Sequence, residues 1–82
     1  MVKIIFFNLL RSKYHWHELD VAPGTFQNVI DELKKNNPSL NEKDFRDCVM
    51  FVNDVRITHL ALFDIQFKDG DKVVLTHFLG GG

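Results

Sequence analysis

The sequence predicts an α+β domain in which one main helix packs on one face of a β-sheet. Three observations predict this class: runs of Ile, Val, Phe and Leu toward both ends of the chain, a single segment with helical periodicity between them, and turn signals that separate the runs. The 82 residues are 45% hydrophobic, which is enough apolar surface for one core. We therefore expect a single domain over residues 1–82.

The first part of the chain predicts two strands. Residues 2–10 are rich in Ile, Phe and Leu, and residues 15–21 form a second strand-like run. Residues 11–14 are then expected to form the connecting turn. Pro23-Gly24 breaks the chain after the second run, so the next element begins there.

The main helix is predicted to follow Thr25, whose hydroxyl can cap it. Apolar residues recur on one helical face from this point, at Phe26, Val29, Ile30 and Leu33. The helix should end at Asn36-Asn37-Pro38, because proline cannot continue it and disfavours helical geometry in the residue before it.

The second half of the chain predicts the rest of the sheet. Two turn signals, Asn53-Asp54 and Asp69-Gly70, divide it. The elements expected are a polar loop at 39–45, a strand at 47–53, a short strand at 55–57, a segment at 58–67 in which Thr58 caps one helical turn through Leu62, and a last strand at 72–78.

Alternation along the strands predicts which residues face the helix, because successive side chains of a strand point to opposite faces. Charged members mark the outward face. The predicted helix side holds Val2, Ile4, Phe6, Cys48, Met50, Val52, Val73 and Leu75, and the open side holds Ile5, Phe7, Val49, Phe51, Val74 and Phe78. The open side is apolar enough to predict a surface that binds a partner. The alternative is that the segment 55–67 folds over part of it.

Composition narrows the function classes. The formal net charge is −1, and no Lys/Arg cluster exceeds Lys34-Lys35, so we expect no binding to nucleic acid. Cys48 is the single cysteine, which suits a reducing compartment. The apolar run at 2–10 is too short to span a bilayer and lacks the features of a signal peptide. We therefore expect a cytoplasmic protein without a membrane partner.

Other chemically active residues give weaker indications. Cys48 lies on the predicted core side, where a thiol is normally inert. His15 and His17 share a strand face, but two histidines without a third ligand predict a solvated edge and no metal site. His77 could bond a partner near the chain end or have a structural role. No catalytic triad, carboxylate pair or phosphate-binding loop is evident, so we expect no enzyme activity from the chain alone.

The strand order and two sequence features resemble the MoaD/ThiS family of sulfur carriers, which share the mixed-sheet β-grasp fold of ubiquitin. The features are the turn and strand Lys68-Asp69-Gly70-Asp71-Lys72-Val73-Val74 and the terminal Gly81-Gly82. Eleven residues follow Asp71 before the chain ends, as in that family. The start, residues 1–7 followed by Arg11, is similar to the small subunit of molybdopterin synthase.

The resemblance implies a function for the C-terminus. An adenylating partner related to the ubiquitin-activating enzymes would use ATP to activate the carboxylate of Gly82. The resulting thiocarboxylate would donate sulfur to the large subunit of molybdopterin synthase, in molybdenum cofactor biosynthesis. Leu79, Gly80 and Gly81 would thread into the partner's active site, as a flexible tail over 79–82 that reaches about 13 Å. The carrier itself would hold no permanent cofactor.

Two differences from the molybdopterin-type carriers leave the sulfur acceptor open. The segment between Asn53 and Asp69 is a few residues longer, and Thr76-His77-Phe78-Leu79 stands where aromatic and proline residues are common. Thiamin or another metabolite is therefore an alternative product. A ubiquitin-like modifier that forms isopeptide bonds, or an interaction domain with frayed glycines, would also fit the sequence.

Overall fold

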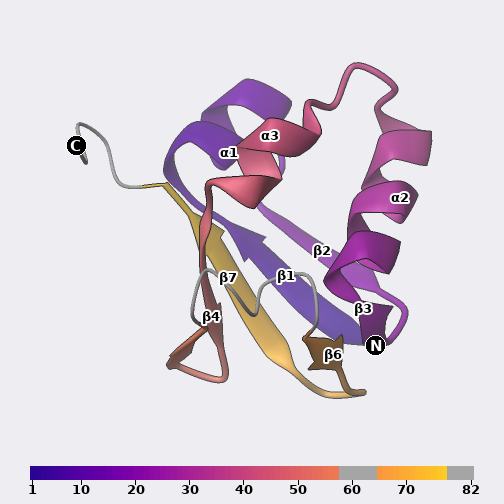
Figure 1. Ribbon diagram of the computed structural model, residues 1–82, viewed down its shortest axis with the longest axis vertical. Helices are drawn as coiled ribbons and strands as arrows, with labels where there is room; N and C mark the ends of the chain where they lie inside the picture. Colours follow the sequence, from indigo (N-terminus) through magenta and orange to yellow (C-terminus); the bar gives the residue numbers. More distant parts are fainter. Residues whose placement is uncertain (58–64, 78–82) are drawn as a thin grey trace.

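The computed structural model describes residues 1–57 and 65–77, apart from the side chain of Leu9. These residues form the helices and strands drawn in Figure 1. In chain order they are β1 (Val2–Phe6), α1 (Asn8–Tyr14), β2 (Glu18–Val21), β3 (Gly24–Thr25), α2 (Phe26–Asn36), α3 (Glu42–Arg46), β4 (Val49–Val52), β5 (Val55–Ile57), β6 (Gln66–Phe67) and β7 (Lys72–Thr76).

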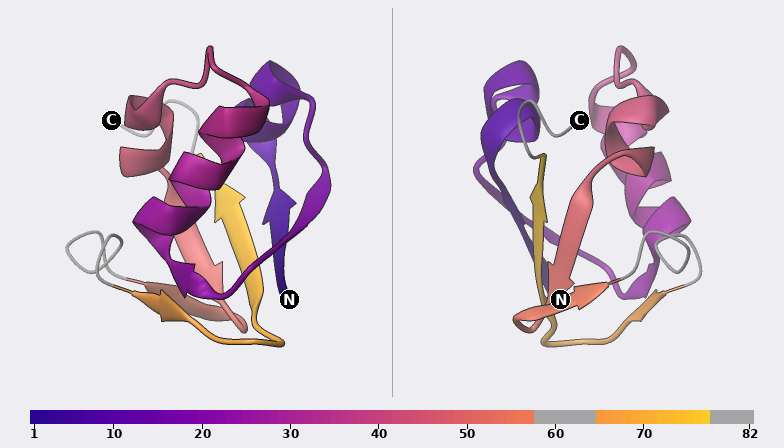
Figure 2. Two further views of the ribbon diagram at one scale, coloured as in Figure 1. Left: turned by 90° about the vertical axis from the view of Figure 1, so that its right-hand side faces the viewer. Right: turned by 60° about the vertical axis from the view of Figure 1, so that its left-hand side comes forward.

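A five-stranded sheet has the order β2-β1-β7-β4-β5, and β3 pairs with β6 in a separate two-stranded sheet. The central strands β1 and β7 run parallel, whereas the other neighbouring strands of the large sheet are antiparallel. A parallel pair requires a long crossover connection, and the chain between β1 and β7 includes the three helices of the described residues. The mixed sheet with one main helix on one face confirms the predicted fold class (Figures 1 and 2).

The main helix α2 forms as the sequence predicted. Thr25 and Asn28 make a reciprocal capping box: the Thr25 hydroxyl accepts from the Asn28 N–H at 3.1 Å, and the Asn28 side chain accepts from the Thr25 N–H at 3.1 Å. The helix ends at Asn36, before Pro38. The four apolar residues of its predicted inner face, Phe26, Val29, Ile30 and Leu33, are all buried.

The core lies between α2 and the sheet. Of the eight residues predicted for the helix side, Val52 is half-buried and packs against the core, and the other seven are buried. A series of aromatic rings crosses the core, each within 6.5 Å of the next by ring centroid: Phe67, Phe26, Phe45, Tyr14, Trp16 and Phe6. These contacts connect one end of the core to the other.

Helix α1 corrects the prediction of a strand over 2–10 and a turn over 11–14. The strand ends at Phe6, and Asn8 adopts φ +54°, which no extended strand has. Leu10 and Tyr14 then lie four residues apart, and both are buried on one helical face. Strand β2 begins only at Glu18, so the predicted strand 15–21 started too early.

Helix α3 corrects the prediction of a polar loop over 39–45. Asn41 caps this helix by accepting a hydrogen bond from the Lys43 N–H at 3.0 Å. Its single buried residue is Phe45, which is fully inaccessible to solvent. Strand β4 begins at Val49, two residues later than predicted, because α3 and its C-cap Asp47 occupy the preceding positions.

The segment at 55–67 was predicted only in part. Strand β5 forms as expected, but the helical turn expected from Thr58 lies outside the described residues. Strand β6 was not predicted, and its Phe67 packs edge-on against Phe26 on the helix side. The described residues of β6 therefore do not cover the open side of the sheet.

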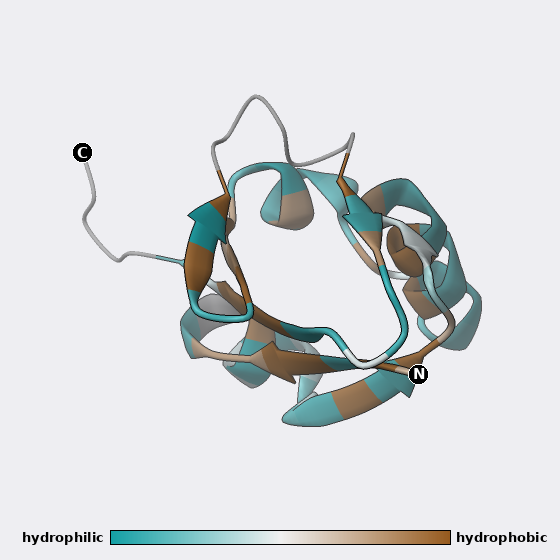
Figure 3. Cartoon of the chain, turned by 90° about the horizontal axis from the view of Figure 1, so that it is seen from below, coloured by the Kyte–Doolittle hydropathy of each residue, from teal (hydrophilic) through white to brown (hydrophobic). Residues whose placement is uncertain are grey.

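The last strand was predicted for 72–78, and β7 ends at Thr76. In Figure 3, brown hydrophobic stretches lie largely on strands, and teal hydrophilic stretches are prominent in helices and turns. Within residues 1–57 and 65–77, no helix is both long and apolar enough to span a membrane.

Candidate functional site: the open sheet face and the tail root

The open face of the sheet carries the residues predicted to bind a partner. Ile5, Val49, Phe51 and Val74 are half-buried, and Phe78 lies outside the described residues. Ile5 of β1 is in register with Val74 of β7, and Val74 is in register with Phe51 of β4. Side chains in register on one face touch across strands, so these three form an apolar row over the middle of the sheet.

Phe7 lies just beyond the end of β1, on the same face. Its side chain is 42% exposed, whereas that of the neighbouring Phe6 is 1% exposed. The Phe7 N–H donates to the Leu75 carbonyl at 2.9 Å, so Phe7 continues the pairing with β7 and the alternation of faces. An aromatic side chain exposed to this extent can enter a pocket on a partner without refolding of the domain.

The tail root, Thr76 and His77, lies where β7 leaves the sheet. Because β7 is parallel to β1, the tail root lies at the same end of the sheet as Phe7. The side-chain amide of Asn8 donates to the Thr76 hydroxyl oxygen at 2.8 Å and to the His77 carbonyl at 2.6 Å. On its other side, Nε2 of His77 contacts the backbone carbonyl of Asp44 in α3. A carbonyl oxygen only accepts, so Nε2 is the donor.

The side chain of Asp44 joins α3 to α1. Its carboxylate accepts from Lys13 Nζ at 2.7 Å and from the Tyr14 hydroxyl at 2.8 Å, and the Tyr14 oxygen accepts from the Asn41 N–H at 2.9 Å. Burial alone would raise the pKa of Asp44, but the hydrogen bonds from Lys13 and Tyr14 outweigh it and lower that pKa. Asp44 is therefore ionised at neutral pH and holds the two short helices together beside the tail root.

Three residues of this site, Asn8, Asp44 and Tyr14, were not predicted from the sequence. Asn8 gave one local signal, because it interrupts an apolar run and asparagine tolerates positive φ. The bonds to Thr76 and Asp44 connect residues far apart in sequence, and no local pattern encodes them. The predicted tail residues Leu79, Gly80, Gly81 and Gly82 lie outside the described residues, as does the predicted flexibility of 79–82, so their roles stay predictions.

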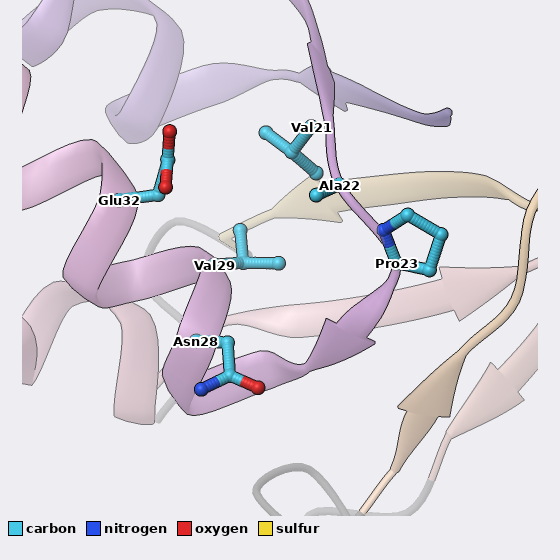
Figure 4. Close-up of a pocket in the computed structure, with 6 residues that line it drawn as sticks. All are labelled: Val21, Ala22, Pro23, Asn28, Val29 and Glu32. Atoms are coloured by element: carbon cyan, nitrogen blue, oxygen red, sulfur yellow. The ribbon is translucent and has the colours of Figure 1, made fainter.

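Two hollows lie on the described surface. One, of about 520 Å³, is lined by Asn8, Arg11, Ser12, His15 and His17. The other, of about 100 Å³, lies between the loop after β2 and the start of α2, where Val21, Ala22 and Pro23 face Asn28, Val29 and Glu32 (Figure 4). Within the described part of the chain, no three His, Cys, Asp or Glu side chains are grouped to hold a metal ion.

Cys48 lies in the core, as predicted from strand alternation. Its side chain is 4% exposed, and its Sγ lies 3.0 Å from the Phe45 carbonyl, to which the thiol can donate. Burial raises the pKa of this thiol to about 12. The thiol is therefore protonated at neutral pH, and it lacks the thiolate character that nucleophilic cysteines require.

The comparisons with known proteins support the fold. No protein-family model matches the sequence, and the comparison with curated protein sequences found no match either. The structure is similar to that of the small archaeal modifier protein 1 (SAMP1) from Methanosarcina acetivorans, with a TM-score of 0.74 and 21% identity over 99% of this chain and 95% of that chain. The chain thus has the β-grasp fold of ubiquitin-like proteins.

Two further solved structures share this fold. A chain of the BexX/CysO complex from Amycolatopsis orientalis matches with a TM-score of 0.74 and 19% identity, over the full length of both chains. A chain of the complex of subunits 1 and 2 of the molybdopterin-converting factor from Helicobacter pylori matches with a TM-score of 0.64 and 20% identity, over 99% of this chain and 97% of that chain. The fold expected from the resemblance to MoaD/ThiS proteins is therefore confirmed.

Proposed function

We propose that the chain is a ubiquitin-like sulfur carrier whose reactive group is the carboxylate of Gly82. The observation that carries the proposal is the course of β7, which runs parallel to β1 in the middle of the sheet and leads at Thr76 into the sequence that ends in Gly80-Gly81-Gly82. This strand brings the chain to one end of the sheet at Thr76, a few residues before the terminal glycines in the sequence. The likeness to SAMP1 and to the molybdopterin-converting factor chain supports the same reading.

The proposed chemistry begins with activation of a poor acyl donor. The Gly82 carboxylate attacks the α-phosphorus of ATP in an adenylating partner, and pyrophosphate leaves. The outer sulfur of a persulfide attacks the acyl carbon, AMP leaves, and an acyl disulfide forms. A thiol then attacks the inner sulfur and breaks the S–S bond, which releases the acyl group with its new sulfur and leaves the thiol in a disulfide with the former persulfide donor. The product is a thiocarboxylate. Glycines suit such a terminus, because residues without Cβ fit a narrow channel and adopt dihedral angles closed to other residues.

The open face is the surface that would bind both the adenylating partner and the sulfur acceptor. Phe7 and the row of Ile5, Val74 and Phe51 present apolar surface next to the tail root, so a bound partner would lie beside the departing tail. The acceptor we propose is an enzyme equivalent to the large subunit of molybdopterin synthase. Support comes from the similarity to a chain of the molybdopterin-converting factor complex.

A second candidate is protein modification, in which the activated glycine forms an isopeptide bond with a lysine. The similarity to SAMP1, which is described as a modifier protein, favours this candidate. Both functions require the same fold and the same activated terminus. They differ in the nucleophile that attacks the acyl carbon, which is sulfur in one case and a lysine amine in the other.

Intact-mass measurement tests the proposal directly. The chain is incubated with an adenylating enzyme of the ubiquitin-activating type, ATP and a sulfur source. We expect a mass increase equal to the difference between sulfur and oxygen, whereas conjugates with other proteins would favour the modifier. Deletion of Gly81 and Gly82 should abolish the product and leave the melting temperature nearly unchanged. If every such enzyme yields neither adenylate nor thiocarboxylate, the proposal is wrong.

A pair of adjacent phenylalanines tests the docking surface. Phe7→Ala should weaken binding to the partner at least about tenfold with little change in the unfolding midpoint, because exposed aromatic side chains often dominate interface energy. Phe6→Ala removes a buried ring and should lower the free energy of unfolding by about 3–5 kcal/mol. Denaturant unfolding and titration with the partner measure both variants. The opposite pattern would show that the faces are assigned wrongly.

A further inference from the structure

We propose that Asn8 and His77 are positioning residues, which fix the direction in which the C-terminal tail leaves the sheet. The inference rests on the proposed function, because it assigns these residues a part in presenting Gly82 to the activating enzyme. It concerns the tail root, Thr76 and His77, and the side chains that hold it, which no local sequence pattern connects.

The first contact is a forked pair of hydrogen bonds from one amide group. Both hydrogens of Asn8 Nδ2 are used, one by the Thr76 hydroxyl at 2.8 Å and one by the His77 carbonyl at 2.6 Å. The hydroxyl is the end of a side chain that is 8% exposed, and the carbonyl is the first backbone acceptor after β7. Pairing with neighbouring strands restrains β7 itself. The side chain of Asn8 also restrains His77, which lies just beyond the strand.

The backbone of Asn8 adopts a conformation that few residue types accept. Its φ of +54° turns the chain sharply between β1 and α1. Asparagine is one of the few residues other than glycine that adopt positive φ at modest cost, and it also carries a side-chain donor. A glycine would make the same turn without the donor. The choice of asparagine therefore fits both requirements at this position.

The second contact comes from the opposite side of the tail root. His77 donates through Nε2 to the Asp44 carbonyl of α3, and Asp44 is itself fixed to α1 through Tyr14 and Lys13. Figure 2 shows α1 and α3 on either side of the end of β7. The tail root is therefore held between two helices, and each helix is bonded to the other.

This arrangement separates binding of the domain from delivery of the tail. The open face determines how tightly a partner binds, whereas the tail root determines the direction from which the following residues start. A fixed starting direction raises the fraction of bound complexes in which the terminal carboxylate reaches ATP. Loss of the restraint should thus lower the turnover rate and leave the Michaelis constant for the carrier nearly unchanged.

The test compares the same substitution at two matched asparagines. Asn8→Gly and Asn53→Gly each remove an amide that bonds neighbouring segments, at φ values of +54° and +50°. Asn53 lies in the turn between β4 and β5, away from the tail root. ATP–pyrophosphate exchange is measured with an activating enzyme that adenylates the wild-type chain. Asn8→Gly should lower kcat about tenfold with KM within about twofold, and Asn53→Gly should change neither.

A second variant distinguishes the loss of the hydrogen-bond donor from the greater backbone freedom of glycine. Asn8→Asp keeps the shape of the side chain and tolerance of positive φ, but a carboxylate cannot donate to the His77 carbonyl. It should lower kcat as Asn8→Gly does. If Asn8→Asp has wild-type kcat, or if both variants change only KM, the positioning role is wrong.

NMR relaxation of the free chain tests the restraint without any partner. The backbone amide of His77 should have an order parameter near the rigid value of about 0.85 in the wild type and Asn53→Gly, and should fall toward about 0.6 in Asn8→Gly. An unchanged order parameter in Asn8→Gly would overturn the proposal. If no activating enzyme uses the wild-type chain, the proposed function fails, and the relaxation result alone decides whether Asn8 restrains the tail root.

Discussion

The two ends of the sheet are held by different kinds of contact. At the end where β7 begins, Asn53 donates to Asp71 at 3.0 Å and accepts from the Lys72 N–H at 3.0 Å, and Asp71 accepts from the Lys68 N–H at 2.8 Å. These side chains belong to two tight turns, and their bonds join residues at most 19 positions apart in sequence. We call this the turn end. At the tail root, by contrast, Asn8 bonds to Thr76 and Tyr14 bonds to Asp44, and these pairs lie 68 and 30 residues apart in sequence.

The comparison shows why one end could be predicted from sequence and the other could not. Asn53 and Asp54 have φ of +50° and +70°, as a two-residue hairpin turn requires, and turn-forming residues at these positions are a local signal. The capping of α2 by Thr25 is equally local. Such features can be recognised without knowledge of the tertiary structure.

The tail root depends on contacts that form only after the chain has folded. The run at 2–10 is apolar apart from Lys3 and Asn8, so it fits a buried strand as well as a helix. The spacing of Leu10 and Tyr14 was not decisive. Helix α3 has five residues and one buried side chain, which is too short to show a period. The open face was easier, because strand alternation alone separates Phe6 from Phe7.

The largest effect is expected from Phe45, the buried residue of α3. Phe45→Ala should lower the free energy of unfolding by about 3–5 kcal/mol, because the ring is fully buried and contacts Tyr14 and Phe26. Phe45→Leu should cost less, because it conserves more of the buried volume. Urea unfolding measures both. A loss under about 1 kcal/mol for Phe45→Ala would show that α3 contributes little to the fold.

A smaller effect is expected at the turn end. Asn53→Ala should destabilise the chain by about 1–2 kcal/mol more than Asn53→Gly, because positive φ is strained for alanine and unstrained for glycine. Both variants lose the same hydrogen bonds, so their difference isolates the backbone conformation. Thermal or urea unfolding of the two variants would show it. Equal stability would mean that the turn changes conformation in the alanine variant.

The smallest effect is a change in the stability of the fold at acidic pH, and it involves both ends of the sheet. The pKa of Asp44 is lowered by Lys13 and Tyr14 against the effect of burial, and that of Asp71 is lowered by the Lys68 N–H and Asn53. A carboxylate whose pKa is lower in the folded state than in the unfolded state stabilises the fold at pH values above its unfolded pKa, near about 3.9. This contribution is lost as the pH falls through the folded pKa. Melting temperature should therefore fall below about pH 4.

Substitution of each carboxylate assigns this pH dependence to an end of the sheet. Asp44→Asn and Asp71→Asn should each melt lower than wild type at neutral pH and show a shallower fall in melting temperature below about pH 4. Melting curves measured between neutral pH and about pH 2 would test both variants. A wild-type slope in either variant would show that the pKa of that residue is the same in the folded and unfolded chains.

The parallel pairing of β1 and β7 has a practical consequence for work with this protein. Lys3 pairs with Lys72 and Phe6 with Leu75, so the chain enters β1 at one end of the sheet and leaves β7 at the other. Met1 lies beside Asp69, with which its amine forms an ion pair, and five residues of strand, about 16 Å, separate it from the tail root. An affinity tag or fluorophore attached to the amine of Met1 would therefore report on complexes from the end of the sheet opposite the tail root, whereas any label added after Gly82 would consume the proposed reactive group.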